Sequence, residues 1–296
     1  MAPVLGGIVI PAVTPFNADG SLGLDKIAAN LATWGQSSVA GYMFLGSNGE
    51  FRSLSDAESL RVAEAAIAGK QDKYLILGIG RESTYLTLAF LERVAALPGG
   101  IDYVSVLTPA YFAASMTPAA LSAHYLSIAD ASPIPVLLYV APGFANQVTP
   151  PAALVAELAG HPNIAGIKDT SKNMMAEYLA LAGGRDDFAV LAGSIGNLRE
   201  CLEGGGRGGV VSAANYLPSL CAGIVTAYQA GQAELAWARL EQVRRLAKAT
   251  AGRFSVAGVK ACMNILGLNA GIPRLPVLPV AADEITAMAA ILQEVG

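Results

Sequence analysis

The sequence predicts an α/β protein built as a (β/α)8 TIM barrel with a C-terminal helical extension. Short apolar segments alternate with longer helical segments along the chain. The pattern recurs eight times, with about 25–40 residues in each repeat, which favours a barrel over a doubly wound sheet. The apolar segments are continuous rather than alternating, as is typical of parallel strands that are buried on both faces.

The strand candidates are short, apolar and evenly distributed along the first two thirds of the chain. They cover residues 6–14, 41–45, 74–80, 103–108, 135–140, 163–168, 188–193 and 208–213.

Helix start signals lie between the strand candidates. Segment 53–69 opens on a serine, carries Asp56 and Glu58 in its first turn and closes on Gly69. Segments 117–130 and 149–160 each open with Thr-Pro, which is typical of an N-cap followed by proline at the first helical position.

Further helical segments follow the last strand candidate, at about 217–230, 232–250, 256–267 and 281–294. One of them would close the barrel and the others would pack on it. Because no linker rich in proline, glycine or serine precedes them, we expect a single domain. Its barrel would cover residues 1–225 and its extension residues 226–296.

Composition excludes several classes of function. Only 14% of residues are charged, against roughly 25% in typical soluble proteins. No apolar run approaches the ~20 residues of a membrane span, and the proline-broken start lacks a basic region, so we expect a cytoplasmic protein without a membrane partner. A net charge of −4 without a basic block argues against nucleic acid. The widely spaced Cys201, Cys221 and Cys262 are expected to be core residues.

The ends of the strand candidates carry the expected active site, because barrel enzymes place it at the carboxyl ends of their strands. These positions hold hydroxyls, amides and one lysine. A metal site is not expected there, because His124 and His161 fall on the helical side and no carboxylate cluster is present. The residues at these ends are Thr14, Ser47, Asn48, Glu50, Arg81, Thr108, Tyr111, Tyr139, Lys168, Thr170, Gly193, Ser194, Ser212 and Asn215.

Lys168 ends the apolar run "IAGIKDTS" and indicates Schiff-base chemistry. Desolvation lowers the pKa of a lysine, and the neutral amine attacks carbonyl carbons. Tyr139 ends the preceding strand candidate and could exchange a proton with the substrate. Each residue also has a purely structural interpretation: Lys168 as an ion-pair partner of Asp169, Tyr139 as a core aromatic, and Tyr111 as a surface aromatic. Their joint position at strand ends favours catalysis.

Two glycine-containing segments receive different interpretations. "GSNGE" at 46–50 offers backbone N–H groups and short polar side chains that suit a carboxylate, although a plain turn before a helix is the alternative. "EGGGRGG" at 203–209 precedes the last strand candidate and lacks the phosphate-loop pattern, so a tight turn is expected there.

Four motifs together resemble the dihydrodipicolinate synthase/N-acetylneuraminate lyase family of class I aldolases. They are "GGIVIPAVTPF" at 6–16, "GSNGE", Tyr139 at a strand end, and "GIKDT" at 166–170. The resemblance extends from about residue 5 to the C-terminal helices. It implies an imine between Lys168 and pyruvate or another 2-oxo acid, no metal or organic cofactor, and a homotetramer arranged as a dimer of dimers.

The resemblance also implies roles for individual residues. Ser47 and Asn48 would bind the carboxylate of the 2-oxo acid. Ser47 would further connect Tyr139 with Tyr111, the relay tyrosine that the family lends across a subunit interface. The remaining substrate-binding candidates are Thr170 and Ser194, from their strand-end positions, and Val211, in a segment resembling the one that lines the pyruvate pocket.

Departures from the family patterns bear on the substrate. Phe144 stands where dihydrodipicolinate synthases have an arginine for the second substrate, and phenylalanine cannot replace a bidentate carboxylate clamp. "AGSIGN" at 192–197 lacks the acidic pair of sialic acid lyases. "GSNGEF", "TPAYF" and "DFAVLAGSIGNL" look more like the 4-hydroxy-2-oxoglutarate aldolases. A dihydrodipicolinate synthase, a 2-keto-3-deoxy sugar acid aldolase or dehydratase, and a catalytically silent barrel that binds a small acid remain the alternatives.

Overall fold

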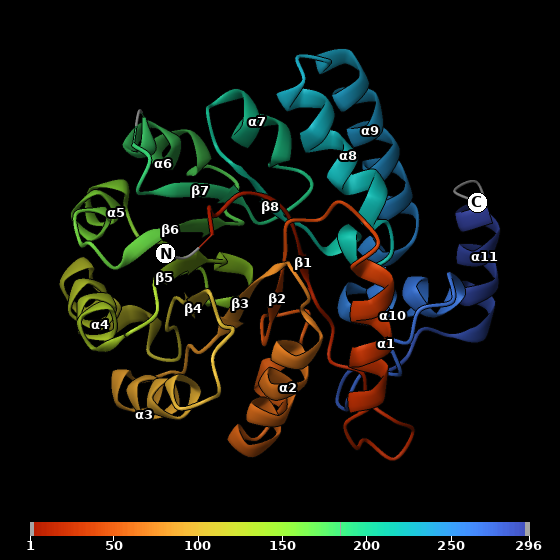
Figure 1. The fold of residues 1–296 in the computed structure, drawn as a ribbon, viewed down its shortest axis with the longest axis horizontal. Coiled ribbons are helices and arrows are strands. Elements are labelled where there is room, and N and C mark those ends of the chain that lie inside the picture. Colours follow the sequence, from red (N-terminus) through yellow and green to blue (C-terminus); the bar gives the residue numbers. More distant parts are fainter. Residues whose placement is uncertain (1–2, 184, 294–296) are drawn as a thin grey trace. The chain divides into compact units, whose positions relative to one another are not determined.

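A computed structural model describes residues 3–183 and 185–293. In the described residues, parallel strands follow one another in hydrogen-bonding order and close into a barrel, which confirms the predicted fold class (Figure 1). The strands are β1 (Gly7–Pro11), β2 (Gly41–Phe44), β3 (Tyr74–Gly78), β4 (Tyr103–Leu107), β5 (Val136–Val140), β6 (Ile164–Asp169), β7 (Ala189–Ala192) and β8 (Gly208–Val210).

The chain forms two compact units. Unit 1 contains the chain up to Gly7 together with Tyr74–Val210, and unit 2 contains Ile8–Lys73 and the chain from Val211 onward. The predicted division at residues 225 and 226 into barrel and extension stays a prediction.

In unit 1, a helix follows each strand from β3 to β7 and lies on the outside of the strands (Figure 1). These helices are α3 (Thr84–Ala95), α4 (Pro118–Ala131), α5 (Ala152–Ala159), α6 (Met175–Ala182) and α7 (Leu198–Glu203). Strands β3, β4 and β5 are buried along their whole length, which explains their continuous apolar sequences.

In unit 2, α1 (Leu24–Trp34) and α2 (Asp56–Gly69) pack against each other. The predicted C-terminal helices are confirmed as α8 (Pro218–Gln229), α9 (Ala233–Ala249), α10 (Ser255–Ile265) and α11 (Ala282–Leu292); residue 294 of the predicted segment lies outside the described residues. Helices α8 and α9 pack side by side (Figure 1).

A β-bulge interrupts the pairing of β5 with β6. Val136 and Leu137 are consecutive, but they pair with Ile164 and Gly166, so β6 carries Ala165 as an extra residue. A Cβ atom on Gly166 would lie 2.3 Å from the carbonyl oxygen of Ala189 on β7, and only glycine permits this approach. The bulge therefore sets the register of every later residue in β6.

Several predicted boundaries differ from the structure. Strand β1 ends at Pro11 instead of residue 14, because the Val13 amide donates to Asn215 Oδ1 at 3.2 Å rather than to a neighbouring strand. Helix α2 begins after Ser55, whose side chain accepts from the Glu58 amide in a capping box, and not at the predicted residue 53. Short 3₁₀ turns occupy Phe51–Ser53 before α2 and Ser212–Asn215 after β8.

The two Thr-Pro predictions have different outcomes. Thr117 caps α4 as predicted, accepting from the Ala120 amide at 3.2 Å. Thr149 does not cap α5, which begins at Ala152, and its hydroxyl donates to the Gln147 carbonyl at 3.3 Å. The second proline of "TPP" moves the helix start, because a residue before proline is disfavoured in the helical conformation.

The cysteines and the longest helices agree with the composition. Cys201, Cys221 and Cys262 are buried and free, as predicted. Among the described residues, the helices all fall short of the length and apolar character that crossing a bilayer requires.

Candidate active site

Lys168 and Tyr139 are brought together on neighbouring strands of unit 1. They are paired residues in the register of β5 and β6, and paired residues of a parallel ladder point to the same face. Lys168 Nζ lies 3.8 Å from the centroid of the Tyr139 ring. Both side chains are almost fully buried. The predicted neighbourhood of the amine and the phenol is therefore confirmed.

Burial lowers the pKa of Lys168, and the nearby Tyr139 opposes this shift. Removing an ammonium from water disfavours its charged form, so the population of neutral amine rises at a given pH. A neutral amine can attack a carbonyl carbon to form an imine, and a phenol beside it can exchange protons with the bound compound.

Backbone contacts from β4 hold the end of β5. The backbone amide and the side-chain hydroxyl of Thr108 both donate to the Tyr139 carbonyl, at 3.1 and 3.3 Å. Tyr125 on α4 in turn donates its hydroxyl to Thr108 Oγ1 at 3.0 Å. Tyr125 has no sequence signal beyond its apolar helix, so sequence reasoning missed it.

Thr170 and Ser194 lie at the ends of β6 and β7. The amide and hydroxyl of Thr170 donate to the Val140 carbonyl at 2.9 and 3.1 Å. Ser194 Oγ accepts from the Asn197 amide at 3.3 Å in the turn that begins α7. Both side chains are half-buried. Their predicted role in substrate binding stays a prediction.

Tyr111 projects from the loop after β4. Its side chain is 77% exposed and contacts Phe112 edge to face, with the ring centroids 4.9 Å apart. Glu82 fixes the backbone of this loop, because its Oε2 accepts from the amides of Ala110 and Tyr111 at 3.1 and 2.9 Å. Sequence reasoning missed Glu82, although it directly follows the strand-end residue Arg81.

Ser47 and Asn48 belong to a tight turn of unit 2 that follows β2. Asn48 Nδ2 donates to Ser212 Oγ at 2.8 Å, which joins the turn to the segment after β8. Thr14 Oγ1 donates to the Gly49 carbonyl at 2.7 Å. Because Ser47 lies in unit 2 and Tyr139 in unit 1, the relay between them stays a prediction.

The segment after β8 is held against β1 within unit 2. The Val211 amide donates to the Val9 carbonyl at 3.3 Å, and the Val211 side chain is fully buried. Asn215 Nδ2 donates to the Pro11 and Ser212 carbonyls at 2.9 and 3.1 Å. Asn215 thus fixes the backbone at two predicted strand ends, while the role of Val211 in lining a pocket stays a prediction.

Sequence comparison places this geometry in a known family. The sequence model of the dihydrodipicolinate synthetase family matches residues 4–295, nearly the whole chain. The chain belongs to the dihydrodipicolinate synthetase family. It is therefore an enzyme of the lyase and aldolase class, as its sequence predicts.

Two relatives of the chain are named for different activities. A 4-hydroxy-tetrahydrodipicolinate synthase of Xanthomonas axonopodis pv. citri is 36% identical over 94% of this chain and 90% of its own length. The "Probable 4-hydroxy-2-oxoglutarate aldolase, mitochondrial" of Emericella nidulans is 31% identical over 97% of this chain and 93% of its own.

A solved structure of the same family has a closely similar fold. The prophage protein YagE of E. coli K12, crystallised in complex with pyruvate, superposes with a TM-score of 0.90 at 25% identity and covers 99% of both chains. The chain is similar to this protein over its full length, including the strands that carry Lys168 and Tyr139.

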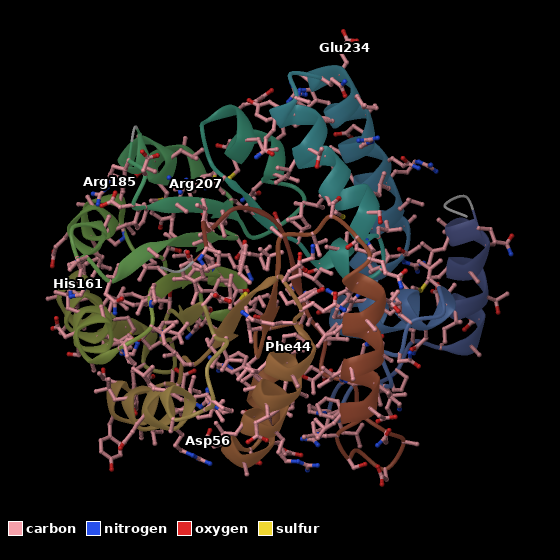
Figure 2. All side chains as sticks on the ribbon, viewed as in Figure 1. Phe44, Asp56, His161, Arg185, Arg207 and Glu234 are labelled. Atoms are coloured by element: carbon pink, nitrogen blue, oxygen red, sulfur yellow. The ribbon has the colours of Figure 1, made fainter. Side chains whose placement is uncertain are left out.

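The two histidines lie on the helical side of the fold, as predicted, and the glycine-rich segment at 203–209 forms the predicted turn. His124 is buried in α4, and His161 pairs with Asp130 at 3.0 Å after α5. The glycine-rich segment turns between α7 and β8, and the Gly206 amide donates to the Cys201 carbonyl at 2.7 Å. Arg207, in the same segment, donates from Nη2 to the Arg185 carbonyl at 3.0 Å (Figure 2).

Proposed function

We propose that the protein is a Schiff-base aldolase in which Lys168 forms an imine with a 2-oxo acid and releases or uses pyruvate. One observation supports this most directly: the buried Lys168 amine lies 3.8 Å from the centroid of the Tyr139 ring. Tyr139 is the residue on β5 that pairs with Lys168 on β6. The named relatives are lyases and aldolases, and YagE was crystallised with pyruvate.

The proposed reaction is the cleavage of 4-hydroxy-2-oxoglutarate to pyruvate and glyoxylate. The Lys168 amine attacks the C2 carbonyl, and water leaves as the imine forms. The C4 hydroxyl then loses its proton, the C3–C4 bond breaks, and its electrons pass into the protonated imine. Glyoxylate departs, the enamine takes up a proton at C3, and water hydrolyses the imine to pyruvate and free lysine.

Tyr139 is the proposed group that accepts the proton of the C4 hydroxyl, since it is the phenol beside the amine. Ser47 and Asn48 are proposed to bind the carboxylate of the 2-oxo acid, and Ser47 with Tyr111 is proposed to extend the proton relay. Thr170, Ser194 and Val211 complete the proposed substrate-binding residues. The subunits are proposed to form a homotetramer, a dimer of dimers.

Phe144 supports a substrate other than aspartate semialdehyde. It ends the 3₁₀ turn Pro142–Phe144 after β5, and its side chain is 57% exposed. A phenyl ring offers no donor to a second carboxylate. The 36% identity to a 4-hydroxy-tetrahydrodipicolinate synthase nevertheless makes that synthase the second candidate.

Two measurements test the proposal. Borohydride reduction in the presence of pyruvate is expected to add one reduced pyruvyl group at Lys168, located by peptide mass spectrometry. A Lys168→Ala variant that is labelled at the wild-type rate would refute the assignment.

A panel of substrates separates the candidate reactions. Coupled assays with 4-hydroxy-2-oxoglutarate, with aspartate semialdehyde plus pyruvate, and with 2-keto-3-deoxy sugar acids are expected to show the highest kcat/KM for the first. Efficient turnover of aspartate semialdehyde would contradict the argument from Phe144.

A further inference from the structure

We propose that Glu50, Lys260 and Arg274 form a positioning cluster that holds the turn at residues 46–50 in the shape that binds the carboxylate of the 2-oxo acid. This inference rests on the proposed function, because it concerns the same carboxylate. All three residues belong to unit 2, and two of them come from the C-terminal part of the chain.

The turn has a conformation that it cannot easily hold alone. Leu45, which directly precedes the turn, and Glu50, which ends it, have φ angles of 56° and 50°, in the left-handed region. This conformation is strained for a residue with a Cβ atom, because Cβ comes too close to the following carbonyl oxygen. The Glu50 amide donates to the Ser47 carbonyl at 3.1 Å and closes the turn. An external contact is therefore needed to keep Glu50 in place.

Lys260 supplies such a contact from α10. Its Nζ lies 2.6 Å from Glu50 Oε1, and it donates to the carbonyls of Thr14 and Ile272 at 2.7 Å each. Thr14 also donates its hydroxyl to the Gly49 carbonyl at 2.7 Å. The ammonium thus holds the turn twice, directly through Glu50 and indirectly through Thr14.

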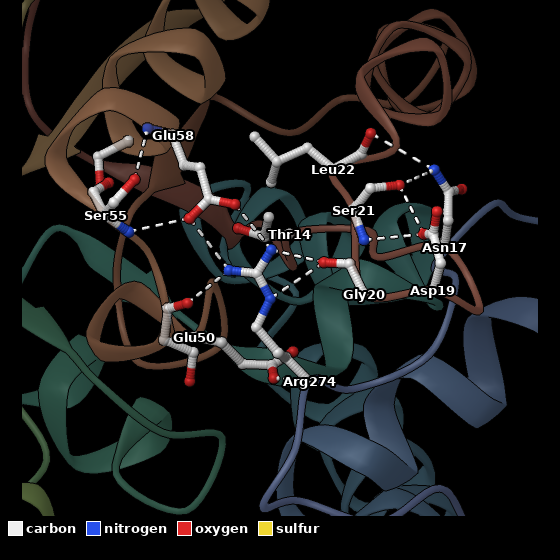
Figure 3. Close-up of polar contacts among 12 residues, drawn as sticks. Thr14, Asn17, Asp19, Gly20, Ser21, Leu22, Glu50, Ser55, Glu58 and Arg274 are labelled. Carbon is white, nitrogen blue, oxygen red and sulfur yellow. Dashed lines mark hydrogen bonds and ion pairs between the residues drawn. The ribbon is translucent and has the colours of Figure 1, made fainter.

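Arg274 holds the other oxygen of Glu50. Its backbone amide donates to Glu50 Oε2 at 2.9 Å. Its guanidinium binds the two carboxylate oxygens of Glu58 at 2.8 and 3.1 Å, and it also donates to the carbonyls of Gly20 and Ser53 (Figure 3). These contacts fix the segment that carries Arg274 to the start of α2, so the amide that reaches Glu50 has a defined position.

Burying the charges of this cluster costs free energy of folding, so stability is a poor explanation for it and a positioning role is favoured. Lys260 is 1% exposed, and burial lowers its pKa to about 8 even though Glu50 opposes the shift. Replacing a buried ion pair with apolar residues is often neutral or stabilising, so such a pair is weak evidence for a role in stability. What this pair provides is a fixed direction for the Glu50 backbone and hence for Ser47 and Asn48.

The experiment compares two carbonyl compounds in borohydride trapping at Lys168. Pyruvate carries the carboxylate and hydroxyacetone lacks it. Lys260→Met is expected to raise the pyruvate concentration for half-maximal trapping about tenfold, because one charge-assisted contact is worth about 1.4 kcal/mol or more. Trapping of hydroxyacetone is expected to stay within about twofold of wild type.

Two milder variants and one control complete the set. Thr14→Val and Glu50→Gln nearly keep the side-chain volume. Each is expected to raise the pyruvate concentration for half-maximal trapping by less than Lys260→Met does, again with little effect on hydroxyacetone. Arg253→Met is the matched control, because it removes a surface ion pair with Glu284, at 2.9 Å, in the same C-terminal region. It is expected to trap both compounds as wild type does.

The outcomes separate this inference from the proposed function. Wild-type protein that fails to trap pyruvate at Lys168 would refute the proposed function. Wild-type trapping, together with variants that lose both compounds equally or lose neither, would refute only the positioning role of the cluster.

Discussion

At the scale of single residues, Lys168 and Asp169 show how neighbouring charges on one strand take different roles. Both are buried at the end of β6, and alternate residues of a strand point to opposite faces. The two Asp169 oxygens accept from the Ser171 amide and hydroxyl at 2.9 and 2.8 Å. Ser171 thus supplies hydrogen bonds to the Asp169 carboxylate, which the alternative interpretation had expected to form an ion pair with Lys168. The Lys168 amine lies beside Tyr139 instead.

Replacing Tyr139 with phenylalanine is expected to separate imine formation from proton transfer. The variant keeps the ring beside Lys168 and loses the hydroxyl. We expect the kcat for 4-hydroxy-2-oxoglutarate to fall about 10²- to 10⁴-fold, the usual contribution of a positioned acid or base. Borohydride trapping of pyruvate is expected to persist. Tyr125→Phe is the control, and equal losses in both variants would contradict the assigned role.

Glu58 is expected to make stability depend on pH in the acid range. Its contact with Arg274 lowers its pKa to about 2, below the ordinary 4.5. The stabilisation is fully present above pH 4.5 and is lost as pH falls toward 2. We expect Glu58→Gln, which keeps an oxygen for the Ser55 amide, to remove about 1–2 kcal/mol of this dependence, after allowance for solvent screening.

Urea unfolding of the wild type and of Glu58→Gln between pH 2 and 6 measures this dependence. Glu284→Gln, which breaks a more exposed pair with Arg253, is the comparison. Parallel stability curves for wild type and Glu58→Gln would show that the ion pair contributes nothing in this range.

At the scale of elements, the bulge in β6 determines which side chain faces β5. Without the extra Ala165, Tyr139 would pair with Ile167, and Lys168 would point to the opposite face. Gly166 permits the bulge because a larger residue would meet the Ala189 backbone. The position of Lys168 opposite Tyr139 therefore depends on the backbone irregularity at Ala165 and Gly166.

A Gly166→Ala substitution tests this dependence. We expect it to destabilise the fold by about 2–3 kcal/mol, in the upper part of the usual range for point mutants, and to reduce pyruvate trapping in the folded fraction. Gly143→Ala is the matched control, because a Cβ there has nothing within 4 Å. Equal unfolding midpoints and equal trapping for the two variants would contradict the role given to the bulge.

The elements also show what a sequence can predict. Strand and helix order, and the strand-end position of Lys168, follow from periodicity and from one lysine that ends an apolar run. The bulge leaves no pattern except a single glycine. Helix α2 begins after Ser55 rather than at Ser53 because Ser55 forms a capping box with Glu58. The contacts of Glu50 could not be predicted, because its partners lie more than 200 positions away in the sequence. Lys260 is a single lysine within the apolar sequence of α10, and such a lysine indicates a functional position in the same way as Lys168 does at the end of its apolar run.

At the scale of the whole molecule, unit 1 exposes large aromatic side chains in the Tyr111 loop and on α3. Tyr85, Tyr111 and Phe112 are 80%, 77% and 69% exposed. Neighbouring exposed aromatic side chains such as Tyr111 and Phe112 are typical of surfaces that contact another protein when they form part of a larger apolar patch. This agrees with the proposed assembly in which Tyr111 is lent to a neighbouring subunit.

A Phe112→Asp variant is expected to dissociate the proposed assembly. A buried carboxylate without a partner is unfavourable at an apolar interface. Light scattering coupled to size exclusion is expected to give a lower mass than for wild type, and kcat is expected to fall because Tyr111 no longer reaches its neighbour. Leu86→Asp, at another exposed apolar side chain, maps the extent of the surface. Unchanged mass and activity would place the subunit contact elsewhere.

The contacts of Glu50 have a consequence for how the protein is made. The turn that follows β2 is synthesised more than 200 residues before Lys260 and Arg274. During translation, N-terminal parts of a chain can fold before the rest exists. Here the turn lacks the Lys260 ammonium and the Arg274 backbone amide until both residues have been synthesised, so we expect the N-terminal part of the chain alone to hold the turn less firmly than the whole chain does.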